Sequence, residues 1–256
     1  MTFEEYIGNP AGKSAVFTAT AREAMRNSYK QKYDAIMVRE HSHIDYTLYK
    51  NKNNRYLAYI KIPSEIIEKF YYDVLIEFYA DSNIQSAGNN LMKYNVRFWS
   101  NDPSFVYTYA HAFLENDMLI TELKSKMSKQ AIKKEAKERN PFNQIGYVKS
   151  IYFAYLLLLS KGLFNTNTFS NASGKLDFNL IKSNIIDADQ KIFQRQEAQN
   201  KLNKTKKKEK IKKENIKDNI ENNIAVSKIN KIKSVSNTNR VSSIKSISTI
   251  KKVKRK

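Results

Sequence analysis

The chain contains no cysteine, and this absence excludes several kinds of chemistry. Without cysteine there is no disulfide framework, no cysteine-ligated metal site and no thiol nucleophile. Histidine is also scarce, since His41, His43 and His111 are the three in the chain. Close neighbours such as His41 and His43 seldom converge on one ion without ligands from elsewhere, so we expect surface hydrogen bonding there and no metal. No cofactor is expected.

A long hydrophobic segment is lacking as well. The most apolar run, Ile151–Leu159, would rise only about 14 Å as a helix, against a hydrocarbon core of about 30 Å. We therefore expect a buried helix there and no membrane span. The first residues, Met1–Glu5, include two acidic side chains and no apolar segment, which argues against a signal peptide.

Residues 201–256 lack glycine, proline and aromatic side chains altogether. They hold 19 Lys and Arg against 4 Asp and Glu, a net charge of +15 out of +20 for the whole chain. Removing them from the whole-chain totals of 45 basic and 25 acidic residues leaves 26 and 21 in residues 1–200. The first 200 residues therefore have the composition of a globular body, whereas the last quarter is a polycation with too few apolar groups for a core.

Alternating side chains predict a β-hairpin in the first third of the chain. Residues 44–50 and 55–62 alternate apolar and polar positions, and the polar residues 51–54 between them supply the turn. Pro63 ends the second strand because proline has no amide hydrogen to donate to a β-ladder. The same alternation predicts two further strands, at residues 71–79 and 94–99.

Helical spacing of apolar residues covers most of the remaining body. Asp102 can cap a helix that begins with Pro103, and Gly162 suits the end of another. The predicted helices are residues 20–39, 103–114, 128–139, 145–161 and 175–200, and residues 165–175 are predicted to form a polar loop.

Together these patterns predict an α+β fold, in which a small, mainly antiparallel sheet is packed with helices and followed by a disordered basic C-terminal tail. The expected organisation is a globular body in residues 1–175, a helical extension in residues 176–200 and a lysine-rich, low-complexity tail in residues 201–256. The sequence pattern does not give the order of the strands.

Two acidic residues raise the question of catalysis. Asp73 and Glu77 fall on one face of a predicted strand, which resembles half of a nuclease-type magnesium site. Such a nuclease would usually place a lysine two positions after the second acid, where this chain has Tyr79. Alternating acids more often form the solvated face of a strand, so a magnesium-dependent nuclease is the least favoured hypothesis.

Two other patterns are weaker. Gly8–Ser14 resembles a phosphate-binding loop, but three residues instead of four separate its first glycine from the Gly-Lys-Ser end, so we interpret it as a turn. Aromatic residues near Arg97 could stack on nucleic-acid bases, although their strand and helix spacing favours a place in the core. These are Trp99, Phe105, Tyr107 and Tyr109.

The tail gives the strongest functional signal. Dense positive charge of this kind binds phosphates without reading sequence, and its affinity falls steeply with salt. The partner could be DNA, RNA or an acidic protein. The candidate nucleic-acid-binding residues are Lys206, Lys207, Lys208, Lys210, Lys212, Lys213, Lys251, Lys252, Lys254, Arg255 and Lys256.

A second pattern runs through the tail. From Val226 to Val253 every third residue is Ile or Val, and Thr238 is the one exception. An α-helix turns about 300° over three residues, so this stripe would wind around it and form no face. A conformation with three residues per turn would keep the stripe on one side. We therefore expect the segment to be disordered alone and extended on a partner.

Four segments of the body carry a resemblance to known proteins, namely IKIPSE (60–65), FYYDVLIEFYADS (70–82), VRFWSNDPSFVYTYAHAF (96–113) and KERNPFNQIGYVKSIYFAYLL (137–157). On these segments, and over roughly residues 1–195, the body resembles a family of uncharacterised virion or structural proteins of tailed bacteriophages. No motif in these segments marks a known activity, so the resemblance assigns no catalytic residue.

The resemblance implies a non-enzymatic protein of the virion, assembled in the bacterial host cytoplasm. The body would dock on other virion proteins, the tail would contact DNA, and self-association into a homo-oligomer remains open. The alternative is a phage-encoded accessory or regulatory protein that binds nucleic acid without sequence specificity and stays outside the particle.

Overall fold

The computed structural model describes residues 1–8, 19–40, 43–80 and 88–253, and beyond residue 213 it describes only some of the side chains. It divides the chain into two compact units, Met1–Gln199 and Asn200–Lys256. The first unit contains the sheet and its helices. The described part of the second unit, up to Val253, is helical.

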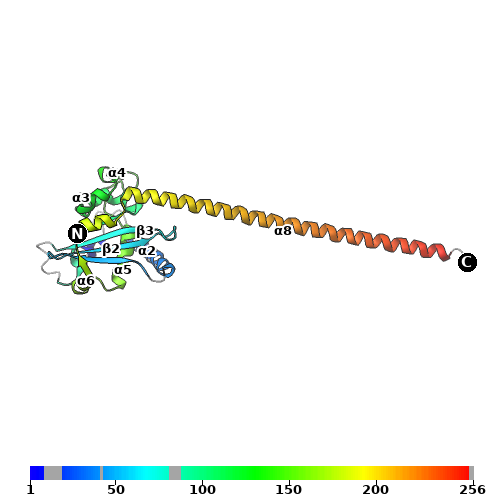
Figure 1. The fold of residues 1–256 in the computed structure, drawn as a ribbon, viewed down its shortest axis with the longest axis horizontal. Helices are drawn as coiled ribbons and strands as arrows, with labels where there is room; N and C mark the ends of the chain where they lie inside the picture. Colours follow the sequence, from blue (N-terminus) through cyan, green and yellow to red (C-terminus); the bar gives the residue numbers. More distant parts are fainter. Residues whose placement is uncertain (9–18, 41–42, 81–87, 254–256) are drawn as a thin grey trace. The chain divides into compact units, whose positions relative to one another are not determined.

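The sheet of the first unit has five strands in the order β4-β3-β2-β1-β5. Figure 1 shows two of them, β2 and β3, side by side. Neighbouring strands are antiparallel except for β5, which pairs parallel with β1. The predicted α+β fold with a small, mainly antiparallel sheet is thereby confirmed. The strands are β1 (Tyr46–Lys50), β2 (Arg55–Pro63), β3 (Tyr71–Tyr79), β4 (Asn95–Ser100) and β5 (Ser173–Lys175).

Helical elements surround the sheet. The α-helices are α1 (Phe3–Gly8), α2 (Ala19–Arg39), α3 (Ala110–Glu115), α4 (Lys129–Lys133), α5 (Lys149–Ser160), α6 (Thr166–Ala172), α7 (Phe178–Asn184) and α8 (Ala188–Val253). The described residues also form two 3₁₀ turns, η3 (Leu91–Lys93) and η5 (Thr121–Lys126), and the π-helical turn η4 (Phe105–Tyr109).

The β1–β2 hairpin forms where the sequence predicts it, and one side chain organises its turn. The Asn51 Oδ1 atom accepts hydrogen bonds from the backbone N–H groups of Asn53 (2.9 Å) and Arg55 (3.0 Å). Asn54 adopts a positive φ of 52°, a conformation that asparagine tolerates better than most residues. The turn therefore fixes the register in which Tyr46 pairs with Ile60.

Both faces of the sheet are covered. On one face, Phe78 and Phe98 pack edge-on or tilted against Phe3 of α1, and Phe78 also meets Phe169 of α6. Helix α5 packs over this face and contacts β2, β3 and β4. The opposite face carries Arg55, whose guanidinium binds Glu122 of η5 and lies over a ring of α7. A sheet covered on both sides buries even its charged residues.

Several predicted elements differ in extent. The segment 165–175, predicted to be a loop, contains α6 and β5. The basic helix predicted over 128–139 ends at Lys133, because the backbone of Lys134 is extended. Further along, Asn140 donates to the carbonyls of Thr108 and Gln144. The helix predicted over 175–200 is two helices, because the chain between Ile185 and Asp187 leaves helical geometry.

The segment predicted as a helical extension, 176–200, lies within the first unit up to Gln199. Asp177 caps α7 by accepting a 2.8 Å hydrogen bond from the backbone N–H of Asn179. Four apolar side chains of this segment are buried, namely Ile181, Ile185, Ala188 and Ile192. They anchor α7 and the first turns of α8 to the body.

The backbone of residues 226–253 is helical as part of α8, so in this conformation the three-residue stripe winds around the helix axis. Helical hydrogen bonds form locally and need no partner. That the segment is disordered alone and becomes extended on a partner stays a prediction. Among the residues the structure describes, no helix is long and apolar enough to cross a membrane.

Candidate nucleic-acid interface

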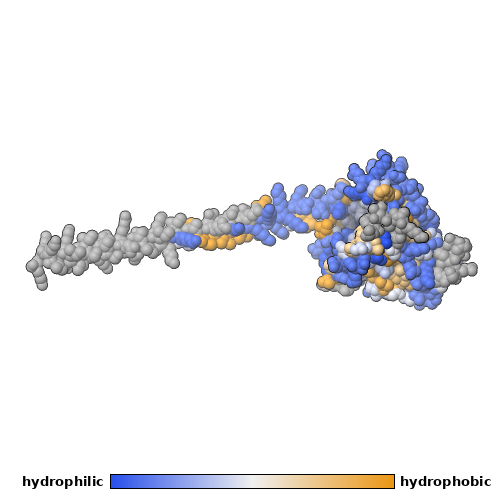
Figure 2. Space-filling view, turned by 180° about the vertical axis from the view of Figure 1, so that it is seen from behind, coloured by the Kyte–Doolittle hydropathy of each residue, from blue (hydrophilic) through white to orange (hydrophobic). Residues whose placement is uncertain are grey.

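The lysines just after the body form a fully exposed segment of α8. Residues 203–213 are all exposed, and Figure 2 shows a hydrophilic surface over this part of the helix. Six of the predicted binding residues lie here, at Lys206, Lys207, Lys208, Lys210, Lys212 and Lys213. The structure thus brings the first predicted cluster together on one helical rod.

The charge density of this segment approaches that of a nucleic acid. Residues 201–213 hold eight lysines and one acidic residue, Glu209, over a helix length of about 18 Å. B-DNA presents about one phosphate charge per 1.7 Å, or about eleven over the same length. Because successive residues turn by about 100°, the lysines point to all sides of the helix. About half of them can therefore face one duplex.

The charge of the tail is divided into three segments, a feature that the total of +15 conceals. Residues 201–213 carry a net +7, residues 214–227 a net −2 and residues 228–256 a net +10. The middle segment carries isoleucines at four-residue spacing, Ile216, Ile220 and Ile224, each about half exposed at 50%, 54% and 49%. Counting charge in windows along the tail would have found this division.

The second predicted cluster lies at the C-terminus. Lys251 and Lys252 belong to the helical backbone of α8, but their side chains are outside the described residues. Lys254, Arg255 and Lys256 lie entirely outside the described residues. The structure therefore describes the side-chain placement of the first cluster only.

Asp73, one of the two candidate catalytic acids, is buried in a hydrogen-bond network. Its Oδ1 atom accepts from the Tyr59 hydroxyl at 2.8 Å, and its Oδ2 atom accepts from Asn101 Nδ2 at 2.8 Å. Burial and the adjacent Asp73 carboxylate both raise the pKa of Tyr59. Nearby, burial lowers the pKa of Lys191, and Asp73 partly offsets this effect. Asp73 thus joins β2, β3 and the start of α8.

Glu77 is fully buried and belongs to an ion-pair network. Its carboxylate pairs with Arg55, whose guanidinium also binds Glu122 Oε1 at 2.7 Å. Burial raises the pKa of Glu77, while Arg55 opposes that rise. The more exposed Glu122 has its pKa lowered by the hydrogen bond from Arg55. The network holds β2, β3 and η5 together.

The two acids do not form a paired-carboxylate site. Four residues along a strand separate Asp73 from Glu77 by about 13 Å, too far for shared ligation of one magnesium ion. No group of three or more His, Asp or Glu able to hold a metal ion occurs in the part of the chain that the structure describes. The positions of Asp73 and Glu77 therefore do not provide the paired-carboxylate site that the nuclease hypothesis requires.

The remaining candidate residues are the aromatic group near Arg97, the histidines and the Gly8–Ser14 segment. Trp99 and Phe105 are fully buried, whereas Tyr107 is exposed, so the aromatic group predicted near Arg97 is not a stacking platform. His43 Nε2 lies 3.1 Å from Asp45 Oδ1, and His111 Nδ1 lies 3.3 Å from Asn143 Oδ1. His41 and most of the Gly8–Ser14 segment fall outside the described residues, although Gly8 itself ends α1.

Comparison of this chain with known proteins identifies neither a family nor a function for it. No family model, curated protein or solved structure matches this chain. The case for function therefore depends on the composition, the geometry above and the resemblance of the body segments.

Proposed function

We propose that this chain is a non-enzymatic structural protein of a tailed-phage virion. In this proposal the body, residues 1–199, docks on other virion proteins. The cationic part of α8 contacts packaged DNA through its phosphates. The place in the virion depends on the resemblance of the body segments to phage structural proteins, and the DNA contact depends on the charge of α8.

The observation that carries the DNA contact is the exposed lysine segment at residues 201–213. Eight lysines on about 18 Å of helix meet a polyanion of similar charge density, and counterion release favours such contacts. Lysines on every side of a helix select no particular orientation, as expected for binding that reads no bases. Exposed chains with this charge need no folded pocket for their ligand.

The burial of apolar side chains supports different roles for the two units. The core lies in residues 1–199, where aromatic and aliphatic side chains from both faces of the sheet are buried. In the second unit, the described Ile and Val side chains from Ile211 to Val226 are about half exposed. Folding therefore depends on the first unit, and charge is concentrated in the second.

The experiment compares the full chain with a truncation that ends at Gln199. The truncation is expected to keep the thermal unfolding temperature of the body and to lose salt-sensitive binding to duplex DNA. Two duplexes of equal length and unrelated sequence should bind the full chain equally well. Retention of DNA binding by the truncation would contradict the proposal. A strong preference for one duplex would show that the chain reads bases, and would contradict binding through phosphates alone.

A further inference from the structure

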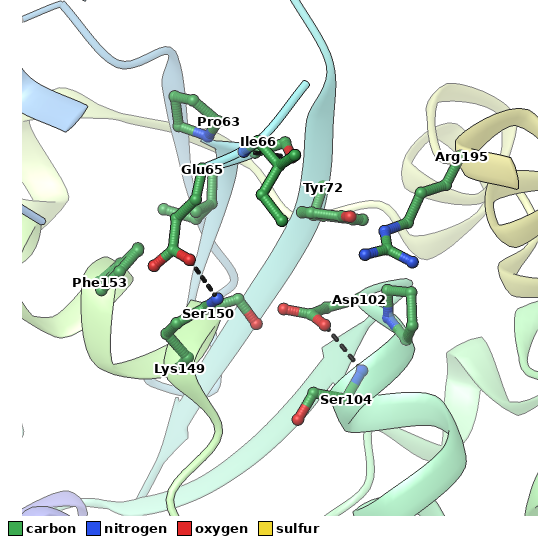
Figure 3. A pocket seen from close by; sticks show the side chains of 13 residues that line it. Pro63, Glu65, Ile66, Tyr72, Asp102, Ser104, Lys149, Ser150, Phe153 and Arg195 are labelled. Atoms are coloured by element: carbon green, nitrogen blue, oxygen red, sulfur yellow. Dashed lines mark hydrogen bonds and ion pairs between the residues drawn. The ribbon is translucent and has the colours of Figure 1, made fainter. Parts of the chain in front are cut away.

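A cavity of about 170 Å³ lies in the body, between the end of β2, the start of β3, the start of α5 and the first turns of α8 (Figure 3). Eight polar residues line it: Ser64, Glu65, Tyr72, Asp102, Ser104, Lys149, Ser150 and Arg195. Apolar groups including Ile66 and Phe153 form the rest of its wall. None of these residues belongs to the proposed DNA-contacting segment.

Three polar atoms in this wall are buried without a hydrogen-bond partner. They are the Ser150 hydroxyl, in a residue that is 1% exposed, the Nε atom of Arg195 and the Oε1 atom of Glu65. A buried polar atom without a partner loses its hydrogen bonds to water and gains none in return, so native proteins contain few such atoms. Figure 3 shows the Ser150 hydroxyl and the Arg195 guanidinium both directed into the cavity.

The other charges of the wall are already paired. Lys149 Nζ lies 3.0 Å from Glu65 Oε2, and Lys32 Nζ lies 3.9 Å from the other oxygen of Glu65. Asp102 and Arg195 have no ion pair with each other among the described residues, so one negative and one positive group remain to recognise a ligand. Burial raises the pKa of the Tyr72 hydroxyl and Asp102 raises it further, whereas Arg195 lowers it through its charge and a hydrogen bond.

In Figure 3 the Asp102 carboxylate lies between the Ser150 hydroxyl and the Arg195 guanidinium. The carboxylate faces the Ser150 hydroxyl, while Arg195 approaches from α8 beside Tyr72. Asp102 Oδ1 accepts a 2.8 Å hydrogen bond from the backbone N–H of Ser104, which fixes the carboxylate in place. A simple anion would meet Asp102 and a simple cation would meet Arg195, so each would be repelled by one of the two groups.

We propose that this cavity binds a small zwitterion of the amino-acid type. Its ammonium group would donate to Asp102 and to the Ser150 hydroxyl. Its carboxylate would accept from Arg195 Nε and the Tyr72 hydroxyl. A small apolar substituent would lie against Ile66. The volume is below the roughly 300–1,000 Å³ of pockets for drug-sized ligands, which limits the ligand to a few heavy atoms.

The test measures binding of defined probes to the full-length protein by calorimetry and by thermal shift. The probes are L-alanine, L-serine and L-leucine as zwitterions, acetate and methylammonium as the two halves, and inorganic phosphate as a simple anion. At least one amino acid is expected to bind saturably at millimolar concentration, with each half-ligand at least about tenfold weaker, because it makes only one charge-assisted contact.

Variants of the cavity then assign the contacts. Arg195→Gln and Asp102→Asn are each expected to weaken amino-acid binding by about tenfold or more, and Ser150→Ala by about threefold to tenfold. Arg195→Lys restores the charge and should recover part of the loss. Glu138→Gln and Arg139→Gln change exposed charges away from the cavity and should leave binding unchanged.

Three results would overturn the proposal. The first is no binding of any amino acid by the wild-type protein, a result that does not depend on how a variant folds. The second is acetate or phosphate binding as tightly as the best amino acid, which would make this an anion site. The third is equal loss of affinity in the Glu138 and Arg139 controls, which would place the binding elsewhere.

Discussion

Replacing six lysines of α8 by glutamine tests the DNA contact without shortening the chain. The positions are Lys206, Lys207, Lys208, Lys210, Lys212 and Lys213, all exposed in the structure. Glutamine has nearly the helix propensity of lysine, so the substitution removes charge while leaving the helix as stable as before. The change in binding therefore reports on charge alone.

The expected magnitude follows from the geometry of the helix. If the tail engages about six phosphates, the slope of log affinity against log salt is about −5, and affinity falls by about a thousandfold between 50 and 200 mM salt. About half of the six substituted lysines can face one duplex, so about three contacts are lost. The slope of the variant should then be near −2.7, and its affinity should fall by only about fortyfold over the same range.

The assay is fluorescence anisotropy of a short labelled duplex at a series of salt concentrations. A matched control replaces six exposed lysines of the body by glutamine, namely Lys52, Lys124, Lys129, Lys133, Lys137 and Lys161. Both variants lose the same net charge, but only the α8 variant should lose slope. An unchanged slope in the α8 variant, or an equal loss in the body variant, would refute the reasoning.

Three further predictions concern folding and catalysis. Arg55→Ala leaves Glu77 buried without its cation and should lower the unfolding free energy by about 3–5 kcal/mol, whereas Glu77→Gln should cost about 1 kcal/mol. Burial raises the pKa of Glu77, so its carboxyl group binds a proton more tightly in the folded state than in the unfolded chain. As the pH falls towards that pKa, Glu77 becomes protonated and no longer lacks a cation. The loss of unfolding free energy in Arg55→Ala should therefore shrink. Denaturation followed by fluorescence of the single, buried Trp99 measures the unfolding free energy of both variants at each pH. A destabilisation by Arg55→Ala that grows at low pH would contradict the ion pair between Arg55 and Glu77. Asp73→Ala should destabilise the body by about 2 kcal/mol or more, because it leaves its buried hydrogen-bond donors unpaired. Cleavage of plasmid in magnesium by the wild type, lost in this variant, would restore the nuclease hypothesis. A peptide of residues 226–256 should be largely disordered as a monomer by circular dichroism, since an isolated helix has no packed face to stabilise it, and a stably folded monomer would contradict that expectation.

The strands were the most predictable part of the fold. Alternation marks β3 at residues 71–79 in both the sequence and the structure, because a strand imposes a period of two on its side chains. Helix α6 was missed because its residues are polar apart from Phe169 and Ala172, so it shows no apolar period. Short helices of this kind form through tertiary contacts, here the burial of Phe169 against Phe78.

The partners of the acidic residues could not be predicted. Asp73 and Glu77 do lie on one face of β3, as the alternation suggests, but that face is covered by η5, α7 and the start of α8. Whether a strand face is solvated depends on the packing of elements distant in sequence. The cavity likewise assembles Asp102, Ser150 and Arg195 from segments far apart in the chain, which no local pattern reveals.

Mass spectrometry of purified phage particles, with copy-number estimation and cross-linking of protein to packaged DNA, tests the proposed function most directly. The account predicts that the chain is present at a fixed copy number and that DNA cross-links map to residues 201–213. Absence of the chain from particles would contradict the virion assignment and favour an accessory nucleic-acid-binding protein. Presence with cross-links confined to residues 1–199 would contradict the assignment of DNA contact to α8.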